Sequence, residues 1–403
     1  MSDWIKTTLG DLVTIGRGSS PRPIHDYLST HGIPWVKIAD ATSSSTRFIN
    51  STKQFIKEEG RSRTVYPGDL IVSNSATPGI PKVMSIEACV HDGWLTFEKY
   101  NNIDKWYLFY FFLDFRRVLE HSASGSVFKN LKIDIVRNAE ISLPSLNEQK
   151  SIADILSSFD DKIELLREQN KTLETLAQTL FKEWFVKFNF PGATGEMINS
   201  ELGEIPKGWR VGALGEEFEI KIGRTPPRKE SEWFSKIPMG LKWASIKDMV
   251  NSGVYIFNTS EYITNEAIDK FNIPIIEEDT TILSFKMTVG KLAITTEKML
   301  SNEAIAQMCH LSGNLSSEFI YCYLKNLDFN SLGSTSSIVT AINSRMIKDL
   351  KILVPDKYIL DKFDIVIKDV FKKIKNNTSQ IQSLEKTRDA LLPKLMSGNI
   401  RVN

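Results

Sequence analysis

Apolar residues recur at steps of three and four between residues 146 and 188, and neither glycine nor proline interrupts this stretch. This spacing places the apolar side chains along one narrow face of a single long α-helix. The stretch begins with residue types that are common at helix N-termini, namely Asn147, Glu148 and Gln149. One asparagine interrupts the apolar stripe, which consists of Ile152, Ile155, Phe159, Ile163, Leu166, Asn170, Leu173, Ala177, Leu180 and Trp184.

The same stripe returns 211 positions later and predicts a second long helix near the end of the chain. It again contains one asparagine, Asn377, and it adds one arginine. Pro393 predicts that this helix bends or ends near its last turn, because proline lacks the N–H that a helix interior requires. The second stripe consists of Phe363, Val366, Val370, Ile374, Asn377, Ile381, Leu384, Arg388, Leu391 and Leu395.

The rest of the chain alternates short apolar runs with loop-forming residues, which predicts mixed α/β domains. The runs "DLIVS" (69–73) and "TTILS" (280–284) have the composition of buried strands. Short helices are predicted around residues 104–121 and 316–327, where apolar and aromatic residues are dense and breakers are absent.

These globular parts also repeat. Trp4 aligns with Trp209 at an offset of 205, and "GIPWVKIAD" (32–40) aligns with "GLKWASIKD" (240–248) at an offset of 208. The offset reaches 211 where "GDLIVSNSATPG" (68–79) aligns with "DTTILSFKMTVG" (279–290), and it then holds through Pro144 and Pro355 and along the helices. Because the matches keep one order and drift only in loop-like segments, we predict an internal duplication of a domain followed by a long helix.

Two long helices with narrow apolar faces need a partner, and each can serve the other. A duplicated unit that packs on its own copy about a pseudo-two-fold axis places these helices antiparallel. Burying an asparagine opposite an apolar residue costs roughly 1–3 kcal/mol of stability, because its amide groups are left without hydrogen bonds. Two asparagines that face each other can form these hydrogen bonds with one another. We therefore predict that Asn170 pairs with Asn377. In this register the numbers of paired residues sum to 547. The predicted interface consists of Ile163, Leu166, Asn170, Leu173, Ile374, Asn377, Ile381 and Leu384.

The register leaves one mismatch, Phe159 opposite Arg388, for which a cation–π contact is the expected solution. Opposite net charges, −3 over residues 145–200 and +4 over residues 356–403, favour association of the two segments. The alternative is that both asparagines are solvent-facing breaks in the stripes and do not meet.

The predicted fold class is therefore α+β and multidomain. Two similar mixed α/β domains are joined by two long antiparallel coiled-coil helices with an internal pseudo-two-fold repeat. The predicted boundaries are a first globular domain at 1–145, a first long helix at 146–190, a second globular domain at 191–355 and a second long helix at 356–403.

The composition of the chain excludes several classes of protein but does not indicate an activity. The chain has 403 residues, 41% of them hydrophobic, and its 50 basic and 49 acidic residues exclude a polycationic coat but allow local basic patches. The three cysteines form no disulfide framework or metal-like spacing, and the N-terminus lacks the apolar core of a secretory signal. The apolar run at 106–115 is too short to span a bilayer. We expect a soluble, cytoplasmic protein with no membrane association.

Several stretches resemble a known family. These are the opening "LGDLVTIGRGSSP", the strand-like "YPGDLIVSNS", the helix-to-domain junction "LFKEWFVKFNFP" with "LGEIPKGW", and the closing "LLPKLMSGNI". Together with the two helices, they make essentially the whole chain similar to the specificity subunit of a type I restriction–modification system. In that family, two target-recognition domains alternate with two spacer helices.

The resemblance implies a non-catalytic reader of double-stranded DNA. Each recognition domain is expected to read one half of a bipartite, asymmetric target, and the helices are expected to set the gap and dock two modification subunits. Those subunits would carry S-adenosylmethionine and methylate adenine, while restriction subunits would supply the ATP- and Mg²⁺-dependent motor and nuclease. No cofactor or metal site is expected in this chain, since neither an adenine-methylase motif nor a G-x-x-x-x-G-K-[ST] loop occurs in it.

A repeated glycine loop, "GRGSSPRP" (16–23) and "GRTPPRK" (223–229), is the leading candidate for contact with DNA. Arginine and hydroxyl side chains suit phosphate and base edges, and a glycine lets the backbone approach a phosphate closely. The alternative is an ordinary surface turn with solvated arginines. The full set of candidate DNA-binding residues is Arg17, Ser19, Ser20, Arg22, Lys37, Asn74, Lys82, Ser126, Lys129, Asn130, Arg224, Thr225, Arg228, Lys229, Lys247, Lys286, Lys291, Ser337, Asn343 and Arg345.

Two other classes of function remain open at this point. A protein-binding scaffold could use the helices to present two adaptor domains, and it would show no salt-dependent affinity for DNA. An enzyme would need an acid–base or metal cluster, and the five scattered histidines offer none.

Overall fold

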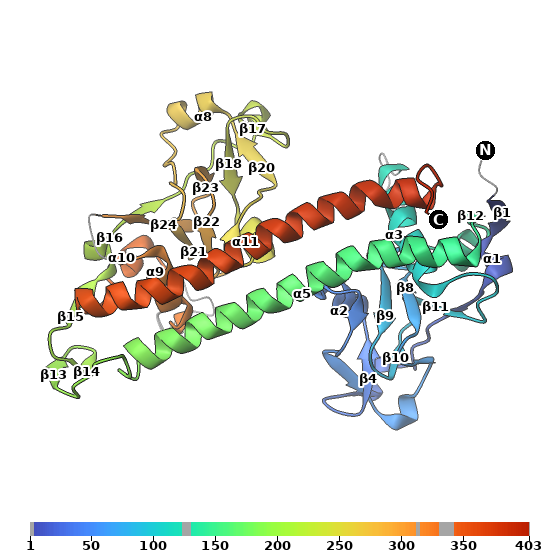
Figure 1. The fold of residues 1–403 in the computed structure, drawn as a ribbon, viewed down its shortest axis with the longest axis horizontal. Coiled ribbons are helices and arrows are strands. Elements are labelled where there is room, and N and C mark those ends of the chain that lie inside the picture. The colour runs from blue at the N-terminus through green and yellow to red at the C-terminus, as the bar shows by residue number, and fades with distance from the viewer. Residues whose placement is uncertain (1–3, 123–129, 312–314, 330–341, 403) are drawn as a thin grey trace. The chain divides into compact units, whose positions relative to one another are not determined.

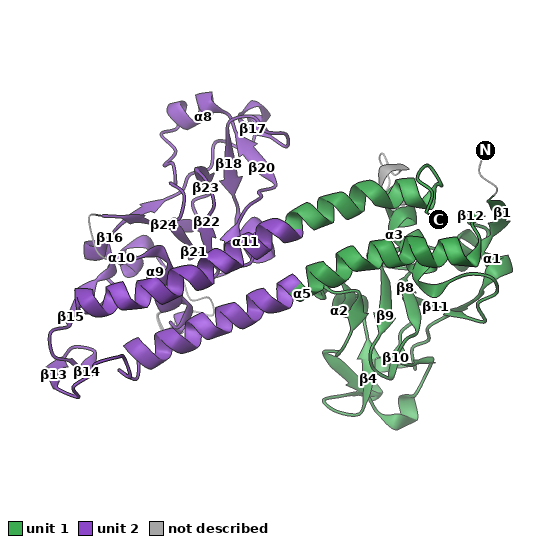
Figure 2. Ribbon diagram, viewed as in Figure 1, with its two compact units in different colours: residues 1–165, 382–403 green, residues 166–381 purple. Residues whose placement is uncertain are grey.

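The computed structural model describes residues 4–122, 130–311, 315–329 and 342–402 of the chain. They form two units (Figure 2): unit 1 contains residues 1–165 and 382–403, and unit 2 contains residues 166–381. Each long helix therefore contributes one segment to each unit. The elements are labelled in Figure 1.

Unit 1 contains two five-stranded sheets and one two-stranded sheet. The first large sheet has the order β2-β11-β8-β9-β5, with strands Thr14–Arg17, Trp94–Glu98, Leu70–Ser73, Pro81–Met84 and Phe48–Ile49. The second has the order β3-β6-β4-β10-β7, with strands Leu28–Ser29, Gln54–Ile56, Ile33–Val36, Ala88–Val90 and Thr64–Val65. The small sheet pairs β1 (Ile5–Thr8) with β12 (Glu140–Leu143). The helices of this part are α1 (Leu9–Leu12), α2 (Ile38–Ser43), α3 (Lys105–Ser122) and α4 (Ile133–Arg137), with short 3₁₀ turns at Ile24–Asp26 and Glu58–Gly60.

Unit 2 repeats this plan. Its first large sheet has the order β16-β24-β21-β22-β19, with strands Phe218–Ile222, Ile305–His310, Thr281–Ser284, Leu292–Thr295 and Tyr255–Ile256. The second has the order β17-β20-β18-β23, with strands Phe234–Ser235, Glu261–Ile263, Leu241–Ala244 and Met299–Ser301. The two-stranded sheets are β15 (Arg210–Ala213) with β25 (Lys351–Val354), and the hairpin of β13 (Met197–Ser200) and β14 (Gly203–Pro206). The helices are α6 (Leu214–Glu217), α7 (Ile246–Asn251), α8 (Asn265–Lys270), α9 (Ser317–Lys325) and α10 (Ser344–Lys348), with a 3₁₀ turn at Ser231–Trp233.

The duplication predicted from the sequence is confirmed by this correspondence. The five strands of the first large sheet match one for one in order and direction between the units, and α3 matches α9. One difference lies at the edge of the second sheet, where β7 pairs with β10 in unit 1 but only the bridge between Ile276 and Met299 occurs at this place in unit 2.

The two long helices are α5 (Leu146–Phe185) and α11 (Lys357–Met396), each of 40 residues, with Pro393 in the last turn of α11. In unit 2, Asn377 Nδ2 donates to Asn170 Oδ1 over 3.0 Å, and the rings of Trp184 and Phe363 lie 5.7 Å apart. Residue numbers thus rise along one helix as they fall along the other, so the segments are antiparallel in the predicted register. In unit 1 the same direction follows from two ion pairs, Asp160 with Arg388 and Glu148 with Arg401.

Two details of the helix prediction are wrong. Arg388 makes no cation–π contact with Phe159 among the described residues but pairs with Asp160, which is buried and also accepts a hydrogen bond from the Tyr110 hydroxyl at 2.7 Å. Val366 is 47% exposed, whereas Ile367 and Phe371 are fully buried. The buried face of α11 is turned at this point because it packs on the sheet side of unit 2 as well as on α5.

Each unit has its own main hydrophobic core. In unit 1 the aromatic residues of α3 pack on α5 and on the last turns of α11. In unit 2 the corresponding core gathers α9, the C-terminal half of α5 and the N-terminal half of α11. The helices are therefore not free rods, because each globular domain packs on them.

Candidate nucleic-acid interface

The repeated glycine loops follow equivalent strands, β2 in unit 1 and β16 in unit 2. In unit 1, the backbone N–H of Gly18 donates to Trp94 O at 2.9 Å and that of Ser19 donates to Val90 O at 3.1 Å. In unit 2, Gly223 N–H donates to Ile305 O at 3.2 Å and Arg224 N–H donates to Ser301 O at 2.9 Å. The acceptors Trp94 and Val90 align with Ile305 and Ser301 at the offset of 211. Both loops therefore bind equivalent residues of the two units.

The reason for glycine in these loops differs from the prediction. A Cβ at Gly18 would overlap with the backbone oxygen of His91, and a Cβ at Gly223 would overlap with that of Ser301. The glycines thus allow the loop to approach the protein's own backbone, not a phosphate. Because the N–H groups of both glycines already bind internal carbonyls, these two groups are not available to an anion.

After the glycine, each loop is held by a hydrogen bond between a hydroxyl and a carboxylate. Ser20 Oγ donates to Asp92 Oδ1 at 2.8 Å in unit 1, and the Thr225 hydroxyl donates to Glu303 in unit 2. The Ser20 hydrogen bond lowers the pKa of Asp92 below its usual value. Burial acts to raise the pKa of Glu303, but the Thr225 hydrogen bond and nearby cations lower it overall. Both carboxylates are therefore charged at neutral pH.

The arginines of the unit 1 loop lie at its surface. Arg17 Nε donates to the backbone oxygen of Asp92 at 2.8 Å, and Arg22 lies 3.4 Å from the Asp92 carboxylate with its side chain 75% exposed. Ser19 is exposed, and its hydroxyl accepts a hydrogen bond from the backbone N–H of Arg63 at 3.1 Å. This loop presents cationic side chains and a hydroxyl around one fixed carboxylate.

The unit 2 loop presents a different set. Arg224 Nη1 donates to Phe271 O at 3.0 Å, and Lys229 is exposed. The Arg228 guanidinium lies 4.2 Å from the ring centre of Phe234 and 2.9 Å from the Glu261 carboxylate. Stacking on an aromatic face holds a guanidinium in one plane while leaving its edge available for hydrogen bonds.

Two of the candidate residues are buried in unit 1 and bind the protein's own backbone. Asn74 is 7% exposed and its Nδ2 donates to Asp92 O at 3.2 Å. Lys82 is 6% exposed, and its ammonium donates to the carbonyls of Ser44, at 3.0 Å, and Thr46. Both side chains hold loops of unit 1 together.

The remaining candidates are spread over several elements. Lys37 is half-buried in unit 1, while Lys247, Lys286 and Lys291 are exposed in unit 2. Asn130 is exposed and bridges to Ser75. Further predicted residues lie outside the described part of the chain, namely Ser126, Lys129 and Ser337.

The short helix α10, just before the last strand of unit 2, contributes two more candidates. Asn343 caps α10, where its Oδ1 accepts the N–H of Met346 at 2.9 Å, so this oxygen already has a structural role. The Arg345 side chain is almost fully exposed and lies 3.7 Å from Asp349.

Sequence reasoning did not single out the acidic residues or their neighbours. His91, Asp92 and Gly93 align with Asn302, Glu303 and Ala304 at the offset of 211, and this repeat is the signal that could have found them. The first residue of each triplet has the same role, since Gly93 N–H donates to His91 Nδ1 at 2.7 Å and Ala304 N–H donates to Asn302 Oδ1 at 3.0 Å. Lys270, whose ammonium lies 4.5 Å from the ring centre of Trp233, was also missed.

The described residues contain neither a metal-binding cluster nor a membrane-spanning helix. In those parts of the chain, no group of three or more His, Cys, Asp or Glu side chains could hold a metal ion. None of the helices placed in the structure has the length and apolar character needed to cross a bilayer.

Comparison with known proteins gives a consistent result. A family model described as "Type I restriction modification DNA specificity domain" matches residues 1–175 and 206–386. The type I restriction enzyme MjaIX specificity subunit of Methanocaldococcus jannaschii is 30% identical over 99% of this chain and 94% of its own length. The HindI specificity subunit of Haemophilus influenzae is 24% identical over 99% and 100%, respectively.

Solved structures show the same fold. The S subunit of a type I restriction–modification system from M. genitalium matches with a TM-score of 0.57 at 17% sequence identity, over 98% of this chain and 96% of that one.

Proposed function

Because this chain belongs to the type I restriction–modification DNA specificity family, we propose that each of its two units reads one half of a bipartite, asymmetric DNA target. Its place in the family makes it a non-catalytic specificity subunit with a role in DNA recognition. The division of the target into two half-sites, and the residues that read them, are what we propose here.

The observation that carries the proposal is one loop built twice with different surface side chains. The backbone bonds of the two loops are equivalent, as are the Ser20–Asp92 and Thr225–Glu303 pairs. Equivalent scaffolds with unlike reading groups are suited to half-sites of unlike sequence. The proposed contact residues are Arg17, Ser19 and Arg22 in unit 1, and Arg224, Arg228 and Lys229 in unit 2.

The helices have a second proposed role. Large apolar side chains are exposed along both, and such exposure favours a protein partner. We assign this surface to two modification subunits, which bring S-adenosylmethionine, and we expect restriction subunits with ATP and Mg²⁺ to join the same cytoplasmic complex. The exposed residues are Leu165, Leu176, Tyr358, Ile365 and Val366.

The proposal is tested by co-expressing the chain with a type I modification subunit and mapping methylated adenines across a genome. We expect one motif of two unlike half-sites separated by a fixed gap. A scaffold with no role in DNA reading would leave methylation random or absent. Titration of the purified complex with duplex DNA containing the motif should also give an affinity that falls steeply with salt.

A further inference from the structure

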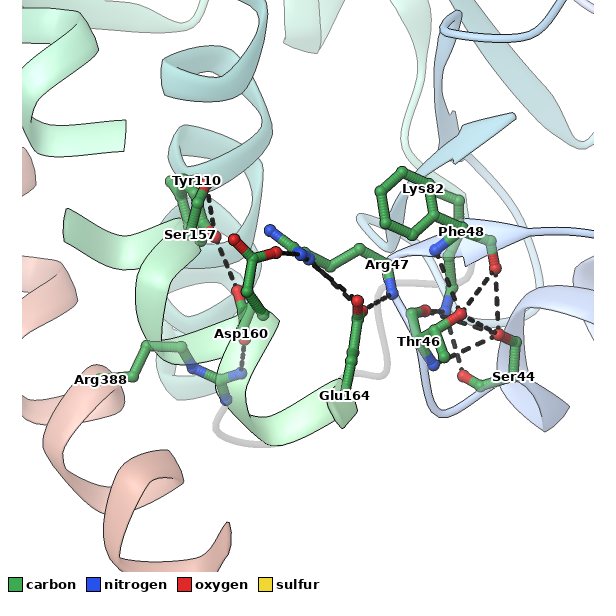
Figure 3. Close-up of polar contacts among 11 residues, drawn as sticks. Ser44, Thr46, Arg47, Phe48, Lys82, Tyr110, Ser157, Asp160, Glu164 and Arg388 are labelled. Carbon is green, nitrogen blue, oxygen red and sulfur yellow. Dashed lines mark hydrogen bonds and ion pairs between the residues drawn. The ribbon is translucent and has the colours of Figure 1, made fainter. Parts of the chain in front are cut away.

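Arg47 joins the sheet of unit 1 to the unit 1 segment of α5 (Figure 3). It lies immediately before β5, at the edge of the first large sheet, and its side chain is 8% exposed. Its backbone N–H donates to Glu164 Oε1 at 2.7 Å and its Nε donates to the same oxygen at 3.3 Å. The guanidinium also pairs with Asp161. At this joint the sheet supplies the cation and the helix supplies the carboxylates.

The position of Arg47 is fixed from the sheet side as well. Its carbonyl accepts the N–H of Val83 at 2.9 Å, and the guanidinium lies 5.5 Å from the ring centre of Phe48 and 5.3 Å from that of Trp106. The Lys82 ammonium binds the carbonyls of the preceding loop, as Figure 3 shows. A guanidinium held in this way can dock only where carboxylates stand at matching positions.

Unit 2 has different residues at the equivalent positions. Val254 replaces Arg47, since its carbonyl accepts the N–H of Ile294 at 2.8 Å just as Arg47 accepts that of Val83. On the helix, Lys375 of α11 replaces Glu164 of α5, at the offset of 211. Unit 2 thus lacks the arginine of the sheet and has a cation where unit 1 has its main acceptor.

The ion pair across the unit 2 joint runs in the opposite direction. Lys375 Nζ lies 2.9 Å from Glu278 Oε1 and 3.1 Å from Asp279 Oδ1, both in the turn before β21. Its ammonium is 5.7 Å from the ring centre of Tyr255, the residue that replaces Phe48. In unit 2 the helix supplies the cation and the recognition domain supplies the carboxylates.

We propose that these opposite charge arrangements make each recognition domain dock on its own helix and at no other position in the chain. The first domain placed on α11 would bring Arg47 against Lys375. The second domain placed on α5 would bring Glu278 and Asp279 against carboxylates. Both exchanges leave like charges facing each other, which is unfavourable. The cost is largest at the unit 1 joint, where the side chains of Arg47 and Glu164 are 8% and 19% exposed. It is smaller at the unit 2 joint, where Glu278 and Asp279 are more than half exposed. The inference concerns assembly of the chain, and only its consequence, that the two half-sites keep their order, rests on the proposed function.

The test is a pair of charge-swap cycles in the full-length chain, read by thermal unfolding and by hydrogen exchange of the joint. Arg47→Glu and Glu164→Lys should each lower the melting temperature of unit 1 by about 5 °C or more. The double variant Arg47→Glu/Glu164→Lys should recover at least half of that loss, with the protection of residues 44–49 restored. If Arg47→Glu does not accumulate as folded protein, Arg47→Gln and Glu164→Gln supply the same cycle.

Unit 2 provides the mirror experiment, in which Lys375→Glu is destabilising and the added change Asp279→Lys restores stability. The matched control is Arg61→Glu, because Arg61 also pairs with two carboxylates, Glu58 and Glu87, but at the surface. This control should change the melting temperature by no more than about 2 °C. Additive losses in both double variants would overturn the inference. They would not affect the proposed function, because no DNA enters the measurement.

Discussion

Asn377 Nδ2 donates a hydrogen bond to Asn170 Oδ1 over 3.0 Å, between α11 and α5 in unit 2. Asn377 is fully buried, and its neighbours along the helix face are the apolar Ile374 and Ile381. The Asn170 amide also donates to Thr378 Oγ1 at 3.1 Å. In this layer of the apolar seam the polar side chains therefore bind one another, and their pairing matches the predicted register of the two helices.

Asn377→Leu should lower the free energy of unfolding by roughly 1–3 kcal/mol, because the partner amide of Asn170 loses its buried hydrogen bond. The double variant Asn170→Leu/Asn377→Leu should regain most of that loss, since no buried amide is left unpaired. Urea unfolding of the full-length chain measures both. A double variant that is less stable than either single variant would show that the asparagines act independently, as solvent-facing breaks would.

The apolar stripes and their register could be predicted from the sequence because helical periodicity and amide pairing are local and chemically simple. The pairing of Arg388 could not, since the register points to Phe159 while the guanidinium reaches the adjacent Asp160 beside the seam. The role of Gly18 was also out of reach, because the carbonyl that excludes a side chain belongs to His91, far along the chain. Burial of Lys82 has the same cause, a tertiary contact with no local sequence signal.

The pair between Asp160 and Arg388 has an apolar counterpart in the other unit. At the offset of 211, Asp160 corresponds to Phe371 and Arg388 to Ala177, and both of these are fully buried. Arg388→Ala should destabilise unit 1 by roughly 3–5 kcal/mol, because it leaves the buried carboxylate with the Tyr110 hydroxyl as its main partner.

The double variant Asp160→Phe/Arg388→Ala transfers the unit 2 residues into unit 1. We expect it to recover most of the stability lost by Arg388→Ala, since a well-packed apolar pair can replace a buried ion pair. Chemical denaturation with a probe in α3 reports on unit 1. Equal instability of the single and double variants would mean that the site cannot accept the larger ring.

The pKa of His91 makes the stability of unit 1 dependent on pH. Burial lowers this pKa below 6.5, outweighing the charge of Asp92, and the positive charge of Lys37 lowers it further. As the pH falls through the unfolded-state value, the unfolded chain takes up a proton that the folded chain does not, so stability declines. The loss reaches at most about 1.4 kcal/mol per pH unit for one group.

His91→Asn should remove this dependence while preserving the fold, because Asn302 already fills the equivalent place and accepts the same backbone hydrogen bond. Unfolding of both proteins from about pH 7.5 down to about pH 5 gives the difference, in which the other histidines cancel. Parallel curves for the wild type and the variant would show that His91 titrates alike in the folded and unfolded states.

Substitution of the loop arginines separates the two proposed half-sites. Arg17→Ala and Arg224→Ala should each weaken DNA binding, with the slope of log affinity against log salt reduced by about 1 if the contact is to phosphate. If the contact is to a base, the loss is about 1–3 kcal/mol and methylation relaxes at one position of the motif. Arg17→Ala should affect one half of the motif and Arg224→Ala the other.

Lys6→Ala and Lys207→Ala are suitable controls, because both remove an exposed cation away from the loops, one in β1 and one after β14. They lower the net charge of the chain equally and should leave the motif unchanged.

Arg17 and Arg224 already bind the backbone oxygens of Asp92 and Phe271, respectively. The fold of the loop must therefore be verified in each variant, by the pKa of Asp92 in unit 1 and by hydrogen exchange of the backbone amide of residue 224 in unit 2. Unchanged affinity and motif in correctly folded variants would exclude these loops as the reading surface. Arg228 and Lys270 would then be the next candidates. The Arg228 guanidinium lies over the ring of Phe234 in β17, and the Lys270 ammonium lies over that of Trp233 in the preceding 3₁₀ turn.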